Sequence, residues 1–145
     1  MVEIKFKKLH PNAKIPAFAK KWDAGFDLSY CGSDYNLSPG ERKLFGTGLC
    51  VEVPNRYEMQ IRPRSGLSFK QGVTVLNTPG TIDSGYRGEV GIILINHGSE
   101  NYLVKSGERI AQGVIGRLEE VSLVETDELS ESERSVGGFG STGVR

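Results

Sequence analysis

The sequence has no excess of either charge, few cysteines and no long hydrophobic run. Lys+Arg and Asp+Glu each number 18, so the formal net charge is 0, whereas a protein that binds nucleic-acid backbones usually has a clear basic excess. No apolar run approaches the ~18 residues of a transmembrane helix. We therefore expect neither direct nucleic-acid binding nor a membrane association.

The two cysteines, Cys31 and Cys50, lack the spacing of a metal site or of a disulfide framework. The first ten residues, MVEIKFKKLH, lack the hydrophobic stretch of a signal peptide. Both observations favour a reducing compartment. We expect a soluble cytoplasmic protein, or a nuclear or organellar one if a targeting segment has been removed.

The length of 145 residues suits a single domain. Hydrophobic residues make up only 37%, so partner subunits could complete some of the apolar contacts. Glycine is abundant, with 19 of the 145 residues against an average usage of about 7%. This content predicts many tight turns or close approaches of the backbone to a ligand.

Apolar residues alternate with polar ones in several short segments, as is typical of half-buried strands. The alternating segments are Val2–Phe6, Tyr57–Ile61, Val73–Val75 and Tyr102–Val104. The continuous run Val90–Ile95, apart from one glycine, predicts a strand buried on both faces. Turn signals separate these segments, for example Ser38-Pro39-Gly40.

One short helix is expected over 65–72, with Ser65 as its N-cap and Gly72 at its end. Exposed N–H groups at such a helix start could also bind an anion, and capping and anion binding both remain open for Ser65. The pattern predicts an all-β fold, either a sandwich, a jelly roll or a barrel, with one short helix and a flexible tail.

The composition changes near Thr126, where an acidic stretch leads into a glycine-rich end. We expect a β-barrel domain over residues 1–125 and a flexible C-terminal arm over 126–145.

Five segments combine glycine with polar or charged residues that a fold alone does not require. They are Ala24–Leu28, Arg62–Gly66, Asn77–Gly88, Glu108–Gly113 and Arg134–Gly143, the last containing Gly-Phe-Gly-Ser-Thr-Gly. Together and in this order they resemble the motif set of the trimeric dUTPase family, over nearly the whole chain.

The resemblance implies an all-β, jelly-roll-like β-barrel and a homotrimer with active sites shared between subunits. It also implies hydrolysis of dUTP to dUMP and pyrophosphate with Mg²⁺, by attack of water on the α-phosphorus. Such a reaction keeps uracil out of DNA and supplies dUMP for dTMP synthesis.

The resemblance implies that Arg64, Ser65, Gly66 and Gln112 bind the phosphate chain. The planar guanidinium of Arg64 suits phosphate oxygens.

Residues 77–88 are expected to bind the nucleoside. Gly80 and Gly85 would allow a tight hairpin whose backbone matches the edge of uracil, and such a site rejects cytosine because its polar groups would stay unpaired. The hairpin residues assigned to the substrate are Asn77, Gly80, Thr81, Ile82, Asp83 and Tyr86. The family places Asn77 on the base and Tyr86 beneath the deoxyribose, where it excludes a 2′-hydroxyl. An ordinary hairpin aromatic is the alternative for Tyr86.

Two acids are candidates for the chemistry. Asp83 is the candidate general base that accepts a proton from the attacking water; its alternative is a turn carboxylate bound to its own backbone. Asp27 is expected near Mg²⁺, indirectly through water, because Mg²⁺ is usually held by phosphates and waters with few carboxylates. A turn or strand-end Asp is the alternative for Asp27.

The resemblance implies that the tail closes over bound nucleotide, with Phe139 stacked on uracil and Arg134 on the terminal phosphate. Gly140, Ser141 and Thr142 would complete these contacts, whereas the alternative is a disordered tail with an incidental Phe. The Gly-rich run lacks the lysine and the strand–helix context of a P-loop.

Three other functions are alternatives for a chain of this kind. A dCTP deaminase would need a glutamate in the strand after the hairpin, where this chain has only Ile92, Ile93, Leu94 and Ile95. A barrel that binds single strands would need a cationic groove and aromatic platforms, against neutral charge and 8% aromatics. A second role in binding a regulatory partner stays open.

Overall fold

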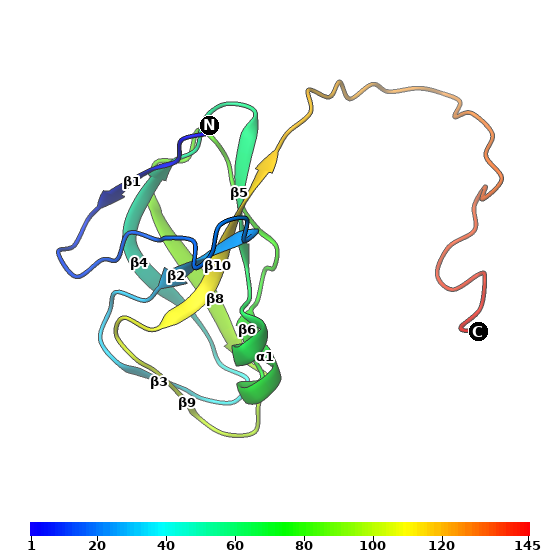
Figure 1. Ribbon diagram of the computed structural model, residues 1–145. Coiled ribbons are helices and arrows are strands. Elements are labelled where there is room, and N and C mark those ends of the chain that lie inside the picture. The colour runs from blue at the N-terminus through cyan, green and yellow to red at the C-terminus, as the bar shows by residue number, and fades with distance from the viewer.

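The computed structural model describes residues 1–145 and consists of strands with a single short helix (Figure 1). The elements in chain order are β1 (Lys5–Lys8), β2 (Gly25–Ser29), β3 (Tyr35–Leu37), β4 (Arg42–Glu52), β5 (Tyr57–Arg62), α1 (Ser65–Gln71), β6 (Val73–Val75), β7 (Gly80–Ile82), β8 (Glu89–Asn96), β9 (Tyr102–Val104) and β10 (Arg109–Arg117). The single helix has seven residues and is too short to span a membrane.

The strands form three antiparallel sheets, in the orders β1-β4-β8-β6, β2-β10-β5-β7 and β3-β9. The all-β jelly-roll expectation is confirmed, but closure into a barrel is wrong. Each four-stranded sheet ends in two edge strands, and no ladder joins one sheet to the other. The sheets are held together by packing between their inner faces instead.

The core is a cluster of 18 buried residues drawn from all three sheets. Phe45, Ile92 and Leu94 come from one large sheet, and Met59 and Ile110 come from the other. Each of these five side chains is at most 1% exposed. Alternation along β5 and β8 places every second residue in this core.

The expectation that residues 90–95 are buried on both faces is only half right. Val90, Ile92 and Leu94 are fully buried, whereas Ile93 and Ile95 are half-buried. β8 lies between β4 and β6 in its sheet, and only one face of that sheet packs against the core. Similarly, the strand predicted over 2–6 begins only at Lys5 and runs to Lys8.

The helix prediction was right about the end of the helix and wrong about its cap. Gly72 terminates α1 in the left-handed conformation, with φ of 68°, and its N–H donates to the carbonyls of Leu67 and Ser68. The N-cap is Arg64, which makes no side-chain capping hydrogen bond. Ser65 is the first helical residue, so its hydroxyl is not used as the predicted cap.

The predicted hairpin over 80–88 is also wrong. β7 pairs with β5 in one sheet, while β8 pairs with β4 and β6 in the other. Residues 83–88 therefore connect two sheets instead of joining two paired strands. The turn in this connection is closed by the N–H of Tyr86, which donates to the carbonyl of Asp83 at 3.1 Å.

Asn96, at the end of β8, ties the end of β3 to the loop between β8 and β9 from inside the protein. Its side chain is fully buried, and its amide nitrogen donates to the carbonyls of Leu37 and Glu100 at 2.9 and 2.8 Å. Its amide oxygen accepts from the N–H of Gly98 at 2.8 Å. All the polar groups of this buried amide thus have partners in neighbouring loops.

Candidate active site

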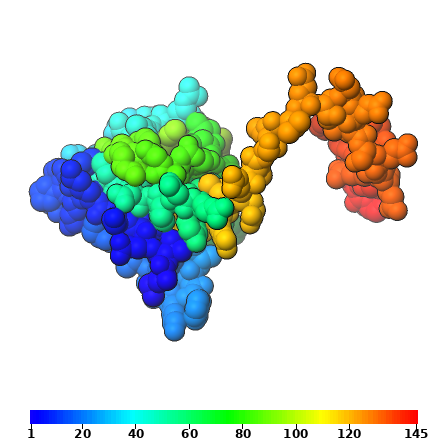
Figure 2. Space-filling model, turned by 90° about the horizontal axis from the view of Figure 1, so that it is seen from above, coloured from blue at the N-terminus to red at the C-terminus, as the bar shows by residue number.

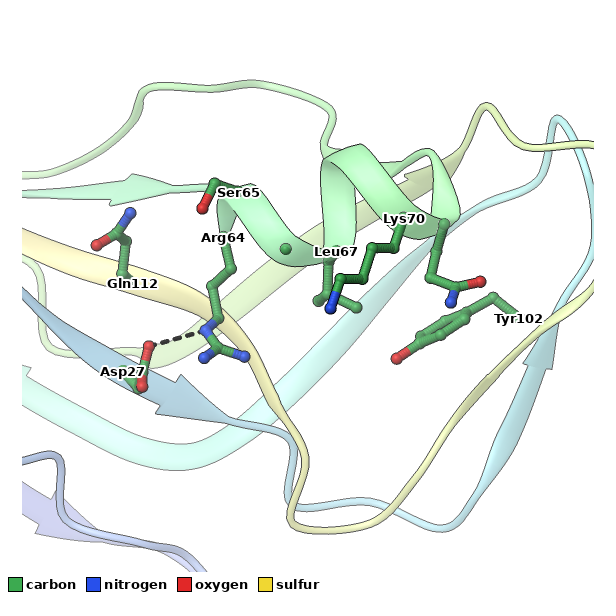
Figure 3. A pocket seen from close by; sticks show the side chains of 9 residues that line it. Asp27, Arg64, Ser65, Leu67, Lys70, Tyr102 and Gln112 are labelled. Carbon is green, nitrogen blue, oxygen red and sulfur yellow. Dashed lines mark ion pairs between the residues drawn. The ribbon is translucent and has the colours of Figure 1, made fainter.

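A polar cleft of about 410 Å³ lies where β5 leads into α1, beside β2 and β10 (Figure 3). Seven of its nine lining residues are not hydrophobic. The lining residues are Asp27, Arg64, Ser65, Gly66, Leu67, Lys70, Gln71, Tyr102 and Gln112. Five predicted site residues therefore meet here: Asp27, Arg64, Ser65, Gly66 and Gln112.

Strand pairing brings these distant segments together. On β10, Gln112 lies opposite Asp27 of β2 on one side and opposite Arg62 of β5 on the other. The chain then leaves β5 and reaches Arg64 and the start of α1 within two residues. The central position of β10 in the sheet thus places the polar residues of three segments at one edge of the cleft.

Asp27 is held by two cations. Its Oδ1 lies 2.9 Å from Nε of Arg64, and its Oδ2 accepts from Nη1 of Arg109 at 3.1 Å. The side chains of Asp27 and Arg64 are 29% and 30% exposed, so the pair is partly screened from solvent. Figure 3 shows Arg64 extended from the start of α1 towards Asp27.

Gln112 secures the segment that carries Arg64. Its amide nitrogen donates to the carbonyl of Pro63 at 3.0 Å. A Cβ atom at Gly25 would lie only 2.4 Å from Oε1 of Gln112. The glycine therefore leaves the space that the Gln112 amide occupies.

The far wall of the cleft is formed by Lys70 on α1 and Tyr102 on β9 (Figure 3). The hydroxyl of Tyr102 donates to the carboxylate of Glu108. Burial, together with this hydrogen bond and the nearby negative charge, raises the pKa of Tyr102 well above its ordinary value. Tyr102 therefore stays a neutral donor, and Lys70 adds positive charge to the cleft.

The predicted nucleoside residues are not part of this cleft within one chain. Gly80 pairs with Ile61 of β5, and a Cβ atom at Gly80 would lie 3.4 Å from Nδ2 of Asn77. Thr81 is exposed and Ile82 is buried in the core cluster. The side chain of Ile82 thus faces inward, which leaves only its backbone for a ligand.

Asp83 is exposed at the end of β7. The hydrogen bond that closes its turn is accepted by its backbone carbonyl, so the carboxylate is not needed for the turn. Tyr86, 43% exposed, folds back over Gly88, and its hydroxyl donates to the carbonyl of Glu89 at 2.8 Å. This contact orients the ring.

The five predicted tail residues lie far from the cleft. The last strand ends at Arg117, and residues 118–145 contain no helix or strand. Figures 1 and 2 show this segment leaving the body as an extended arm. Within it, Nε of Arg134 donates to the carbonyl of Gly137 at 3.0 Å, and Phe139 is fully exposed. Gly140, Ser141 and Thr142 are exposed as well.

Sequence reasoning missed four residues that line the cleft and one beside it: Leu67, Lys70, Gln71 and Tyr102, and Arg109. Arg109 belongs to the segment Glu108–Gly113, one of the five that resemble the family motifs. Its positive charge, two residues after Gly107, could have marked it as a candidate for the site. Tyr102 carried no signal beyond strand alternation. Its place in the cleft follows from how the β3-β9 sheet lies beside α1.

Comparison with known proteins supports one family. A dUTPase family profile matches residues 11–143. A deoxyuridine 5'-triphosphate nucleotidohydrolase of Nautilia profundicola is 56% identical, covering 98% of this chain and 99% of its own length. One of the same name from Clostridioides difficile is 54% identical, covering 99% of both chains.

Similarity to solved structures supports the same family. The dUTPase of Staphylococcus bacteriophage 80alpha with dUpNHpp has a TM-score of 0.89 and 30% identity, covering 98% of this chain and 99% of that one. A dUTPase variant from phage phi11 of S. aureus, which has a structural Mg(II) ion, has a TM-score of 0.79 and 26% identity, covering 87% and 97%. With a profile over almost the whole chain and relatives above 50% identity, this chain belongs to the dUTPase family.

Proposed function

We propose that this chain hydrolyses dUTP to dUMP and pyrophosphate. The observation that carries the proposal is the cleft in which Arg64, Ser65, Gly66 and Gln112 converge, in a chain whose relatives are named deoxyuridine 5'-triphosphate nucleotidohydrolases. The reaction would remove dUTP before it enters DNA and would supply dUMP for dTMP synthesis.

The cleft suits a triphosphate chain. Arg64 offers a planar set of N–H donors, and the Ser65 hydroxyl is exposed and not used as a helix cap. Lys70 contributes a second cation on the far wall of the cleft. Charge-assisted hydrogen bonds from such donors are stronger than neutral ones, so phosphate oxygens are the groups that this cleft favours.

The nucleoside would be recognised by the segment around β7. Backbone groups of Gly80, Thr81 and Ile82 and the amide of Asn77 would bind the uracil edge, with Tyr86 against the sugar. The exposed ring of Tyr86 and its anchored hydroxyl support a fixed flat surface there. Such a surface would leave no room for a 2′-hydroxyl.

Asp83 would act as the general base. A water oxygen attacks the α-phosphorus as the Asp83 carboxylate takes one of its protons. A new P–O bond forms, the bond from the α-phosphorus to the bridging oxygen breaks, and pyrophosphate leaves with that oxygen. The exposed carboxylate of Asp83, which its own turn does not use, supports this role.

Mg²⁺ would enter with the triphosphate. The chain has no cluster of three or more His, Cys, Asp or Glu residues that could hold a metal, which suits an ion held mainly by phosphate oxygens and waters. Each carboxylate oxygen of Asp27 contacts one guanidinium and keeps a further lone pair. Asp27 could thus accept a hydrogen bond from a metal-bound water, and the ion would neutralise charge on the phosphates.

The complete site would be shared within a homotrimer. In one chain the phosphate cleft, the β7 segment and the C-terminal arm are separate, which supports assembly from several subunits. Arg134, Phe139, Gly140, Ser141 and Thr142 would then close over nucleotide bound to another subunit. The exposed arm in Figure 2 is free to make such contacts.

One assay tests the proposal against deamination. Purified protein with Mg²⁺ is given dUTP, dCTP, dTTP or UTP, and pyrophosphate and ammonia are both measured. We expect pyrophosphate from dUTP alone at a high rate, and no ammonia from dCTP, because β8 carries only aliphatic side chains over 92–95. Rapid release of ammonia, or equal release of pyrophosphate from dCTP, would contradict the proposal.

A further inference from the structure

Arg109 touches both charged residues at the edge of the cleft without lining the cleft itself. It is the first residue of β10. Its Nη1 donates to Oδ2 of Asp27 at 3.1 Å, and its backbone carbonyl accepts from Nη1 of Arg64, also at 3.1 Å. Arg109 thus contacts Asp27 through its side chain and Arg64 through its backbone carbonyl.

These contacts decide which N–H groups of Arg64 remain free. A guanidinium has five N–H donors. In Arg64, Nε lies against Asp27 and Nη1 donates to the carbonyl of Arg109, which leaves Nη2 without a protein partner. The plane of the group is therefore fixed from two sides while donors remain for a ligand.

Arg109 also prevents Asp27 from pairing fully with Arg64. A carboxylate and a guanidinium readily form two parallel hydrogen bonds. Here each oxygen of Asp27 contacts a different arginine, so Arg64 is bound through one oxygen only. Without Arg109, the free Oδ2 could turn to Arg64 and occupy the donors that a phosphate would use.

The net charge of the cluster formed by Asp27, Arg64 and Arg109 also favours a contribution of Arg109 to polyphosphate binding. Two guanidinium groups around one carboxylate leave the cluster with one net positive charge, and loss of Arg109 would leave it neutral. A polyphosphate carries several negative charges, so a neutral cluster would attract it less.

We propose that Arg109 is a positioning residue for polyphosphate binding: it holds Asp27 away from full pairing with Arg64 and so keeps Arg64 available to the ligand. The inference rests on the proposed function for the identity of the substrate. It is tested first with a probe that does not depend on hydrolysis.

The first experiment measures the affinity for inorganic tripolyphosphate by calorimetry. R109Q removes the charge, R109K keeps it, and R117Q is the matched control because Arg117 is an exposed arginine on the same strand. We expect R109Q to weaken binding about tenfold, as is typical for coupled charged neighbours, R109K to recover most of it, and R117Q to bind like the wild type. Wild-type affinity in R109Q would overturn the proposal.

A double-mutant cycle then tests whether Arg109 acts through Asp27. In the D27N background the carboxylate is gone, so adding R109Q should lower the tripolyphosphate affinity clearly less than it does in the wild-type background, by the loss of one positive charge alone. An equal loss in both backgrounds would show that Arg109 acts independently of Asp27 and would refute the positioning role. Arg109 is 60% exposed, so R109Q should fold; if it does not, R109M, which keeps the aliphatic stem, replaces it under the same criteria.

Kinetics with dUTP separate this inference from the proposed function. For R109Q we expect KM to rise about tenfold and kcat to change less than threefold, because binding is affected more than the chemical step. A loss confined to kcat would overturn the inference. A wild-type protein that releases no pyrophosphate from dUTP would refute the proposed function, while the tripolyphosphate affinities would still decide the role of Arg109.

Discussion

The carboxylate of Asp83 is free to take part in chemistry, although Asp83 lies in a tight turn. Because the backbone carbonyl of Asp83 closes the turn, replacing the carboxylate by an amide should leave the local structure intact. We expect D83N to keep nucleotide binding and to lose about 10²–10⁴-fold in kcat, the usual contribution of a general base.

Pyrophosphate release and dUpNHpp affinity, measured on the same preparation, check this prediction. D127N, in the exposed acidic stretch, is the matched control and should keep full activity. Near-normal turnover in D83N would remove Asp83 from the proposed mechanism.

Tyr86 offers a second test at a single residue. Its hydroxyl is anchored on Glu89, so the ring and the hydroxyl can be separated by mutation. Y86F should keep the preference for dUTP over UTP, because in the proposed site the ring would still fill the space of a 2′-hydroxyl. Y86A should narrow the preference at least tenfold, within the ~10–200-fold range for a change in pocket shape.

The ratio of kcat/KM for dUTP and UTP in the three proteins is the measurement. An unchanged ratio in Y86A would show that Tyr86 does not exclude the ribose. A loss of preference in Y86F would instead assign selectivity to the hydroxyl.

At the scale of elements, the short helix α1 depends on its last residue. Gly72 has φ of 68°, and a Cβ atom there would lie 2.7 Å from the backbone nitrogen of Gly98. G72A should therefore lower the free energy of unfolding by about 1–3 kcal/mol, from left-handed strain and crowding against backbone. G66A, in the same helix with open space around it, should be neutral or slightly stabilising.

Urea unfolding of both variants gives the comparison. Equal midpoints for G72A and the wild type would mean that the helix end can relax without cost. This result would weaken the account of how α1 ends beside the turn at Gly98.

The junction between β3 and β4 should contribute to the pH dependence of stability. The Tyr35 hydroxyl donates to Glu41, and the Ser38 N–H donates to it as well, which together hold the pKa of Glu41 below its ordinary value. A carboxyl whose pKa is lower in the folded state stabilises above its unfolded pKa, and this stabilisation is lost as pH falls through the folded pKa. E41Q should therefore flatten the decline in stability below pH ~4.5, with the exposed E100Q as control.

Melting temperatures between pH 3 and 7 check this prediction. If E41Q and the wild type lose stability in parallel as pH falls, the hydrogen bonds of Glu41 do not contribute to acid sensitivity.

Sequence patterns located half of the strands, because alternation is a local property. The segments 57–61, 73–75 and 102–104 all became strands. The pairing of strands is not a local property, so the sequence pattern predicted it wrongly. The glycines at 80 and 85 indicated a tight hairpin, yet β7 and β8 belong to different sheets. The contact between Arg109 and Asp27 spans 82 positions and depends on the register of β2 against β10, which no short pattern encodes.

At the scale of the whole molecule, the C-terminal arm over residues 118–145 has a role that the structure of the β-sheets does not determine. Ordering a chain segment costs roughly 1–2 kcal/mol per residue, and stacking of Phe139 on a base returns about 1–3 kcal/mol. Closure would also expel water from around the α-phosphate. Truncation before Arg134 should therefore reduce kcat strongly while the proposed trimer and the melting temperature of the core stay unchanged.

Sedimentation and pyrophosphate release test both halves of this prediction. Mixing inactive D83N with the inactive truncated protein, after subunit exchange, should restore part of the activity if Asp83 and Phe139 of one site come from different chains. Wild-type turnover in the truncated protein would make the arm dispensable, and a fully active monomer would refute shared sites.

The buried amide of Asn96 has a consequence for chemical ageing. Asparagine deamidates when the following backbone nitrogen attacks its side-chain carbonyl. Here that nitrogen, on His97, donates to the carbonyl of Gly72 at 2.8 Å, and the Asn96 amide is held on three sides in the core. Native protein should thus preserve Asn96 through long storage while exposed asparagines such as Asn55 and Asn101 convert, and aspartate at position 96 would record molecules that had unfolded.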